Sequence, residues 1–154
     1  MFSATPMNVT PGQHVILRSE CPITKAGRVL QLYGHRHANN HRFSVMRVRA
    51  GKEEIVYEDY DWIEPLFLEF SSLVQNPMAD RASQTRGGYS GILDLMPGDT
   101  LAFECDIVNN TSRTFVGKNE ALDDEMCIMV GDTVGTQIPT ICNAKTTPVT
   151  TTGK

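Results

Sequence analysis

Two short stretches of the chain carry residue types that bind metal ions. His35 and His37 are separated by one residue, and Met126 stands immediately before Cys127. In an extended strand, residues i and i+2 point to the same face, so the two imidazoles can reach one metal ion together. A thioether is a soft, weak ligand, and two imidazoles with one methionine suit copper, especially Cu(I), better than zinc, magnesium or calcium. If Met126 folds back onto the histidine strand, the chain has a copper site.

Other residues of these types have more ordinary interpretations. His41 is a third imidazole on the next strand, a group behind the ligands or an exposed turn residue, and we take the last as the default. His14 lies near a turn and has no evident partner in the sequence. A single methionine is usually core packing, so Met126 needs its sequence context to stand out. The acidic run at residues 123–125 is expected to be a solvated turn rather than a cation site.

The four cysteines favour disulfide bonds. Their number is even, and none of them lies in a CxxC arrangement, which argues against zinc knuckles and thioredoxin-like motifs. Two disulfides in an oxidising compartment, secreted or periplasmic, are the natural interpretation, and four separate buried thiols are the alternative. The N-terminus lacks the charged and apolar regions of a secretory signal, which a mature chain would have lost.

Length and composition indicate one globular domain. The chain has 154 residues, of which 40% are hydrophobic and 21% charged, and this is enough to bury a core. A net charge of -4 with scattered basic residues argues against nucleic acid or an anionic membrane as a partner. No apolar run is long enough to span a membrane. We assign residues 1–145 to one domain and residues 146–154, rich in Thr, to a flexible tail.

Alternation of apolar and polar residues predicts a chain built from strands. The expected strands cover residues 13–20, 28–36, 42–49, 54–58, 66–70, 90–95, 100–108 and 125–132. Turns are expected at residues 51–52 and 96–99, and an exposed loop at 75–88. Short strands separated by Gly, Pro, Asn and Asp turns, without a helical period, predict an all-β sandwich or barrel.

Aromatic residues border the expected copper site. Tyr33 should share a face with His35, where it either lines the same pocket or is simply a half-buried strand tyrosine. The cluster of Tyr60, Asp61, Trp62 and Glu64 lies in a loop between strands. It contacts a substrate or caps the sandwich, and we favour capping because amphipathic aromatic side chains often do this.

Taken together, these landmarks make the chain resemble a known family. It is similar to the C-terminal domain of the copper type II, ascorbate-dependent monooxygenases, the group of the peptide-amidating and dopamine-hydroxylating enzymes. The likeness covers roughly residues 13–142, nearly the whole chain, in sequence-pattern terms. The matching features, in the family's order, are Cys21, the HxH of His35 and His37, Pro97-Gly98-Asp99 before a strand with Cys105, Glu125-Met126-Cys127, and Cys142.

The resemblance implies roles for several of these residues. His35, His37 and Met126 match the ligands of the family's substrate-side copper, which activates oxygen for hydroxylation of a C–H bond in a small-molecule substrate. Ascorbate is the reductant in that family. The resemblance also implies a jelly-roll-like antiparallel β-sandwich and two disulfides, Cys105–Cys127 and Cys21–Cys142.

The chain departs from the family in two respects. A second copper in those enzymes is held by three histidines of a preceding domain, and His14 and His41 are too few to replace them. A missing N-terminal domain or a partner chain would have to supply it. The positions that hold a peptide carboxylate in the amidating enzymes carry Tyr33, Ile128 and Val130 here, so a peptide C-terminus is not the expected substrate.

Two other functions remain open from the sequence. The first is a non-catalytic secreted or periplasmic copper-binding protein, such as a carrier, scavenger or sensor. The second is an adhesion or structural sandwich whose histidines bind nothing. Copper binding at the HxH pair separates the second from the others, and turnover separates an enzyme from a carrier.

Overall fold

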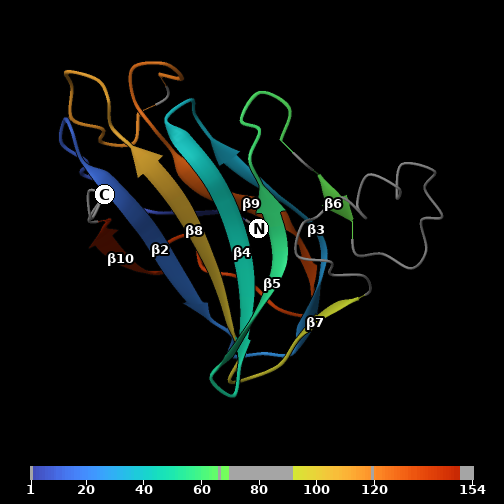
Figure 1. Cartoon of the computed structure of the whole chain (residues 1–154). Helices are drawn as coiled ribbons and strands as arrows, with labels where there is room; N and C mark the ends of the chain where they lie inside the picture. Colours follow the sequence, from blue (N-terminus) through green and yellow to red (C-terminus); the bar gives the residue numbers. More distant parts are fainter. Residues whose placement is uncertain (1, 66, 70–91, 119, 150–154) are drawn as a thin grey trace.

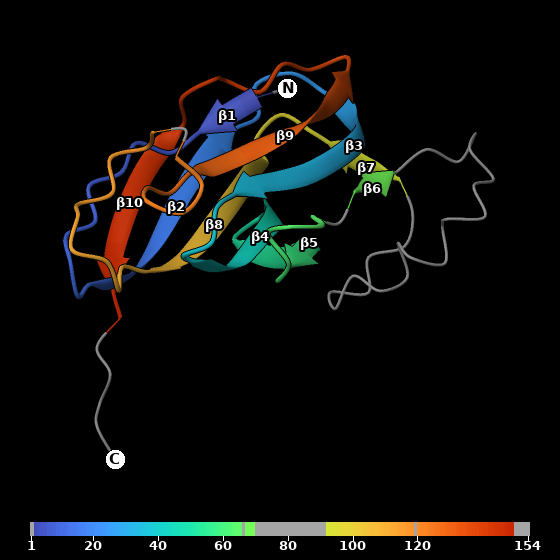
Figure 2. The same cartoon turned by 90° about the horizontal axis from the view of Figure 1, so that it is seen from above.

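Two antiparallel sheets packed face to face make up the fold, as the sequence predicts. The computed structural model describes residues 2–65, 67–69, 92–118 and 120–149, and it is all-β over these residues (Figure 1). We call the two layers the first and the second sheet, and Figure 2 shows one stacked on the other. The described residues contain no helix that could cross a membrane.

Each sheet joins strands from distant parts of the chain. The first sheet has the order β1 (Phe2–Ala4), β9 (Cys127–Val134), β3 (Gly27–Arg36) and β6 (Leu68–Glu69), and β7 (Leu93–Leu95) also pairs with β3. The second sheet has the order β10 (Asn143–Pro148), β2 (His14–Pro22), β8 (Thr100–Val108), β4 (Asn40–Arg49) and β5 (Lys52–Asp59). All pairs between these strands are antiparallel.

The core lies between the two inner faces. In the long strands such as β2 and β8, alternate residues point inward, as the period of two requires, and burial of their side chains is the main driving force for folding. The largest fully buried apolar side chains are Tyr57, Phe43, Phe103, Phe115, Leu17, Leu32, Leu93, Leu95, Leu101, Ile107 and Met129. Phe43 of β4 is at their centre and packs against the rings of Tyr57 and Phe103, each with a centroid distance of 6.0 Å.

One glycine lets β3 approach the second sheet closely. A Cβ atom at Gly34 would overlap the ring of Phe43, so a larger residue there would push the sheets apart. The amide of Gly34 donates to the hydroxyl of Tyr57 at 3.3 Å, which ties the same point of β3 to β5. Because Gly34 directly precedes His35, this contact fixes the height of the histidine strand above the core.

Both disulfides have the pairing that the family resemblance implies. Cys105 of β8 bonds to Cys127 of β9 and so links the two sheets across the core. Cys21 of β2 bonds to Cys142, which lies just before β10. Neither is compatible with a strongly reducing environment, so the two bonds agree with an oxidising compartment.

The end of the chain differs from the expectation. Residues 146–148, which the sequence predicts to be part of a flexible tail, are the last three residues of β10, which pairs with β2. This strand is fully exposed and has no apolar alternation, so main-chain hydrogen bonds to β2 are what its sequence can offer. The expected loop at 75–88 and residues 150–154 lie outside the described residues.

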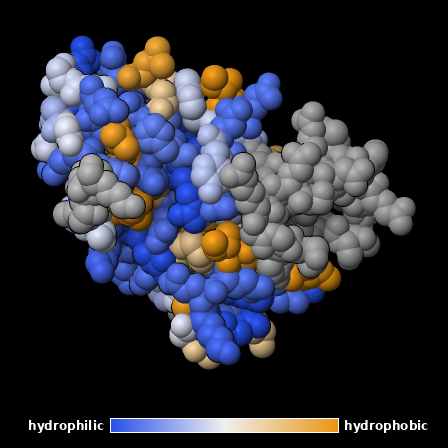
Figure 3. Space-filling model, viewed as in Figure 1, coloured by the Kyte–Doolittle hydropathy of each residue, from blue (hydrophilic) through white to orange (hydrophobic). Residues whose placement is uncertain are grey.

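The outward face of the second sheet is a network of ion pairs. Arg18 contacts Glu20, Glu53 and Glu104 at 2.6 to 2.8 Å, and the face seen in Figure 3 is accordingly mostly hydrophilic. His14 belongs to this network: its Nε2 lies 2.6 Å from Asp106 Oδ1. This partner was not predictable from the neighbouring residues, because it lies on β8, ninety-two residues away.

Candidate metal centre

The two histidines of the HxH motif follow each other at the end of β3. The strand ends at Arg36, and the chain turns through residues 37–39 into β4. His35 is exposed, whereas His37 is 3% exposed. Their ring centroids are 5.4 Å apart with an interplanar angle of 85°, so the pair is close enough for one ion to bridge both imidazoles. The two rings are therefore neighbours, although His37 lies just beyond the last residue of β3.

The residue between them points the other way, into the core. The side chain of Arg36 is fully buried, and its Nη2 lies 3.1 Å from Oδ2 of Asp59, the last residue of β5. Asp59 also accepts a hydrogen bond from Tyr57. A buried guanidinium needs such a partner, because an uncompensated buried charge is very costly. This ion pair, which the sequence reasoning missed, joins the histidine strand to the second sheet.

The ring of His37 is held in one orientation. Its Nδ1 lies 3.1 Å from the backbone carbonyl oxygen of Asp124. A carbonyl only accepts, so Nδ1 carries the proton and donates, and Nε2 of the neutral ring keeps its lone pair. Metal-binding histidines commonly have this arrangement, with the outer nitrogen bonded to a carbonyl and the other one to the metal.

His35 is the more open of the two ligands. Partial burial lowers the pKa of the His35 imidazole below its usual value of 6.5, and the nearby His37 lowers it further. The neutral ring is the form that binds metal. This environment therefore favours the ligating form of His35 at neutral pH.

The main chain of Met126 runs next to that of His37. The register of β3 and β9 pairs His35 with Ile128 and Arg36 with Cys127, so the next step places Met126 opposite His37. His37 and Met126 stand one residue beyond the described ends of β3 and β9, and their amides bond to the same oxygen of Glu125. Its side chain is half-buried.

Glu125 fastens the two chain segments to each other. Its side chain is fully buried, and Oε1 accepts hydrogen bonds from the amides of His37 at 2.5 Å and Met126 at 2.9 Å. Its other oxygen, Oε2, accepts from the amide of Asn39 at 2.9 Å. Burial raises the pKa of Glu125 to about 7, against the opposing effect of the three amides.

Asp124 organises the preceding loop in the same manner. Burial disfavours its charge, but four backbone amides outweigh that effect and lower the pKa of its carboxyl group. The donors are the amides of Val116, Gly117, Lys118 and Glu125. The expected solvated acidic turn is thus wrong for Asp124 and Glu125, which are 3% and 0% exposed, and only Asp123 is exposed.

Two further predicted residues are His41 and Tyr33. His41 is exposed, as expected, but it lies in β4 rather than in a turn, at an irregularity of the β4–β8 register between Asn40 and Arg42. Tyr33 is half-buried on β3 and stacks on Phe67, with ring centroids 5.5 Å apart.

The arrangement fits a soft metal ion better than a hard one. In the part of the chain that the structure describes, no three side chains of His, Cys, Asp or Glu are grouped closely enough to hold a metal. The set expected from the sequence, His35, His37 and Met126, differs from such groups because its third donor would be a thioether. Imidazole and thioether donors suit copper, and the Nδ1 contact of His37 with the Asp124 carbonyl is of the kind found behind metal-binding histidines.

Comparison with protein-family models and with curated proteins gives no match to this chain. The family resemblance therefore rests on the quoted residues alone. The geometry of the centre is independent of it, since the register, the burial and the hydrogen bonds come from the fold.

Proposed function

We propose that the chain is a copper-binding domain of the type II, ascorbate-dependent monooxygenase kind, with one copper ion held by His35, His37 and Met126. The observation that carries this proposal is the joint anchoring of the ligand segments. The amides of His37 and Met126 share one oxygen of Glu125, and the His37 ring is oriented by Asp124. His37 and Glu125, eighty-eight positions apart in the sequence, are thereby kept beside each other.

The chemistry of the proposed centre follows from its donor set. A copper ion held by these residues would supply Cu(I)/Cu(II) redox chemistry, and ascorbate is the reductant we propose for it. His37 is the fixed ligand, since it is buried and bonded through Nδ1. His35 is open to solvent, so a small C–H substrate would approach from its side.

A copper titration tests the proposal directly. The protein should bind one equivalent of Cu(I), and the double variant His35→Ala, His37→Ala should lose it. His41→Ala is the matched control, because His41 is an exposed histidine outside the centre. Unchanged stoichiometry in the double variant would overturn the proposal.

A copper carrier, scavenger or sensor is the second candidate. The observation that favours it is the placement of the other two histidines. His14 is bonded to Asp106 and His41 is exposed, so we do not expect either to be a ligand of a second copper. In the monooxygenase case, a preceding domain or a partner chain would hold that copper. Reduction of the Cu(II) form by ascorbate, followed by substrate-dependent oxygen uptake, supports the enzyme. Tight Cu(I) binding without oxygen uptake supports the carrier.

The proposal also includes the cellular compartment in which the protein works. Two disulfides require an oxidising environment, and we propose that the protein is secreted or periplasmic. Fractionation of the producing cells tests this, and recovery in a reducing cytosol with four free thiols would contradict it.

A further inference from the structure

We propose that Glu125 is the positioning residue of the copper centre: its carboxylate sets the separation of His37 and Met126 and thereby decides whether the thioether reaches the metal. This inference rests on the proposed function and adds a residue that does not itself touch the metal. It follows from which atoms the two carboxylate oxygens contact.

The two oxygens of Glu125 have different tasks. Oε1 accepts from the amides of His37 and Met126, which belong to the two segments that carry the ligands. The two amide nitrogens therefore lie no farther apart than the sum of their distances to one shared atom. Oε2 accepts from the amide of Asn39 and closes the turn that leads from the HxH motif into β4.

Side-chain pairing gives no competing explanation for a buried acid at this place. The charge of Arg36 favours the ionised form of Glu125, but the ion pair of this guanidinium is with Asp59. Within the described residues, the Glu125 side chain accepts three hydrogen bonds, all from backbone amides of the turn and of the Met126 segment. A fully buried carboxyl group is costly, so a fold keeps one where its contacts determine a local geometry.

Four consecutive residues, 124–127, together hold the proposed ligand segment in place. The backbone oxygen of Asp124 orients the His37 ring, Glu125 fixes the backbone, and Met126 supplies sulfur. Cys127 then ties the segment to β8 through its disulfide. Partners of this outer kind typically change metal affinity by about 10- to 100-fold when they are removed.

Two substitutions at Glu125 separate the tasks of its oxygens. Glu125→Gln keeps one acceptor oxygen, which can still serve His37 and Met126, while its amide group meets the amide of Asn39 donor to donor. Glu125→Ala removes all three contacts. We expect the affinity for Cu(I) to fall in the order parent, Glu125→Gln, Glu125→Ala, with a loss of about 10- to 100-fold for the last.

X-ray absorption of the Cu(I) form is the readout that a merely structural role would not change. Copper–sulfur scattering should persist in Glu125→Gln and disappear in Glu125→Ala, while copper–nitrogen scattering stays in both. Asp99→Asn is the matched control. Asp99 is another buried carboxylate that accepts a backbone amide, from Met96, but it lies in a turn away from the centre. Its variant should lose stability and keep the sulfur signal.

The outcomes distinguish this inference from the proposed function. Parent-like affinity and sulfur scattering in Glu125→Ala would overturn the positioning role and leave the copper site standing. If the parent protein shows no sulfur scattering, the proposed site itself fails. Should Glu125→Ala not fold, Glu125→Gln decides: it must bind Cu(I) more weakly than the parent, and equal binding contradicts the role.

Discussion

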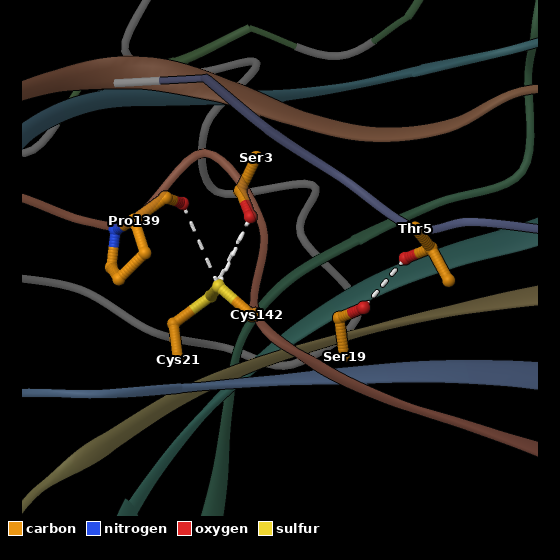
Figure 4. The surroundings of a disulfide bond; sticks show 6 residues. All are labelled: Ser3, Thr5, Ser19, Cys21, Pro139 and Cys142. Atoms are coloured by element: carbon orange, nitrogen blue, oxygen red, sulfur yellow. Dashed lines mark hydrogen bonds between the residues drawn. A yellow bond between two sulfur atoms is a disulfide. The ribbon is translucent and has the colours of Figure 1, made fainter.

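The two disulfides of this protein have contrasting surroundings. Cys105–Cys127 crosses from one sheet to the other and directly follows Met126, beside buried carboxylates that bind backbone amides. Cys21–Cys142 joins β2 to the segment before β10 and is surrounded by hydroxyl groups: Ser3 Oγ lies 3.1 Å from Cys142 Sγ (Figure 4). We call these regions the ligand corner and the terminal corner.

The two disulfides should differ in what they contribute: one mainly lowers the entropy of the unfolded chain, and the other mainly fixes the local geometry of the Met126 segment. The terminal crosslink closes a loop of 121 residues and the ligand crosslink one of 22 residues. Longer loops lose more conformational freedom in the unfolded chain when they are closed, so the terminal crosslink should contribute more stability. The ligand crosslink should contribute more to the metal centre, because it fixes the segment of Met126.

Loss of the terminal disulfide should give the largest change in stability. Replacing Cys21 and Cys142 with Ala should lower the free energy of unfolding by about 5 kcal/mol, from the loop-closure argument. Denaturant unfolding of the metal-free protein measures this. At low denaturant, where the variant is folded, Cu(I) affinity should equal that of the parent. A large loss of affinity in the folded variant would contradict the separation.

Loss of the ligand disulfide should lower the stability less than loss of the terminal disulfide, and should lower the affinity for Cu(I) more. Replacing Cys105 and Cys127 with Ala should lower the free energy of unfolding by about 3.5 kcal/mol, because the closed loop is shorter. Cu(I) affinity, measured by competition with a chromophoric chelator, should fall by about tenfold or more. Equal effects of the two double variants on copper would remove the distinction between the corners.

Acid should weaken the terminal corner through one carboxylate. Asp99, whose backbone oxygen accepts from the amide of Ile23 near Cys21, has its pKa lowered by its hydrogen bonds with Arg49. A lowered pKa stabilises the fold above the unfolded value of about 3.9 and loses that contribution as pH falls through the folded value. Asp99→Asn should therefore flatten the pH dependence of the free energy of unfolding below about pH 4.

The copper centre should respond to acid earlier. His35 must be neutral to bind, and its pKa is lowered from 6.5 by burial and by His37. Copper should thus be retained as pH falls to 6.5 and released only below it. The stability of the terminal corner should still be intact in that range. Release above pH 6.5 would contradict the assigned surroundings of His35.

A single hydroxyl pair should give the smallest effect. Thr5 Oγ1 and Ser19 Oγ lie 2.7 Å apart and are buried in the terminal corner (Figure 4). Thr5→Val keeps the shape and removes the hydrogen bond, so the free energy of unfolding should fall by about 1 kcal/mol. Copper binding should not change, which a parallel titration of the variant checks.

Strand alternation made most of the fold predictable. The period of two indicated a sandwich, which the structure confirms, and the expected neighbours His35 and His37 have ring centroids 5.4 Å apart. β10 was not predictable in this way. It is an exposed edge strand, so its sequence has no buried face and hence no apolar alternation to detect.

The polar interior of the ligand corner was harder to foresee. Glu125 looked like part of a solvated acidic run, because its burial depends on amides that are far away in the sequence. The burial of Arg36 could have been predicted, because the same alternation that exposes His35 directs Arg36 inward. A charged residue at an inward position requires a partner, and Asp59 is that partner.

Copper–sulfur scattering in the Cu(I) form of the parent protein tests the central claim most directly. We predict two imidazole nitrogens and one sulfur, with the sulfur contribution lost in Met126→Ala. Met96→Ala, at an exposed methionine of the Met96–Asp99 turn, is the control and should keep it. A parent protein without sulfur scattering, or a sulfur signal that survives Met126→Ala, would contradict the assignment of His35, His37 and Met126 as a copper centre.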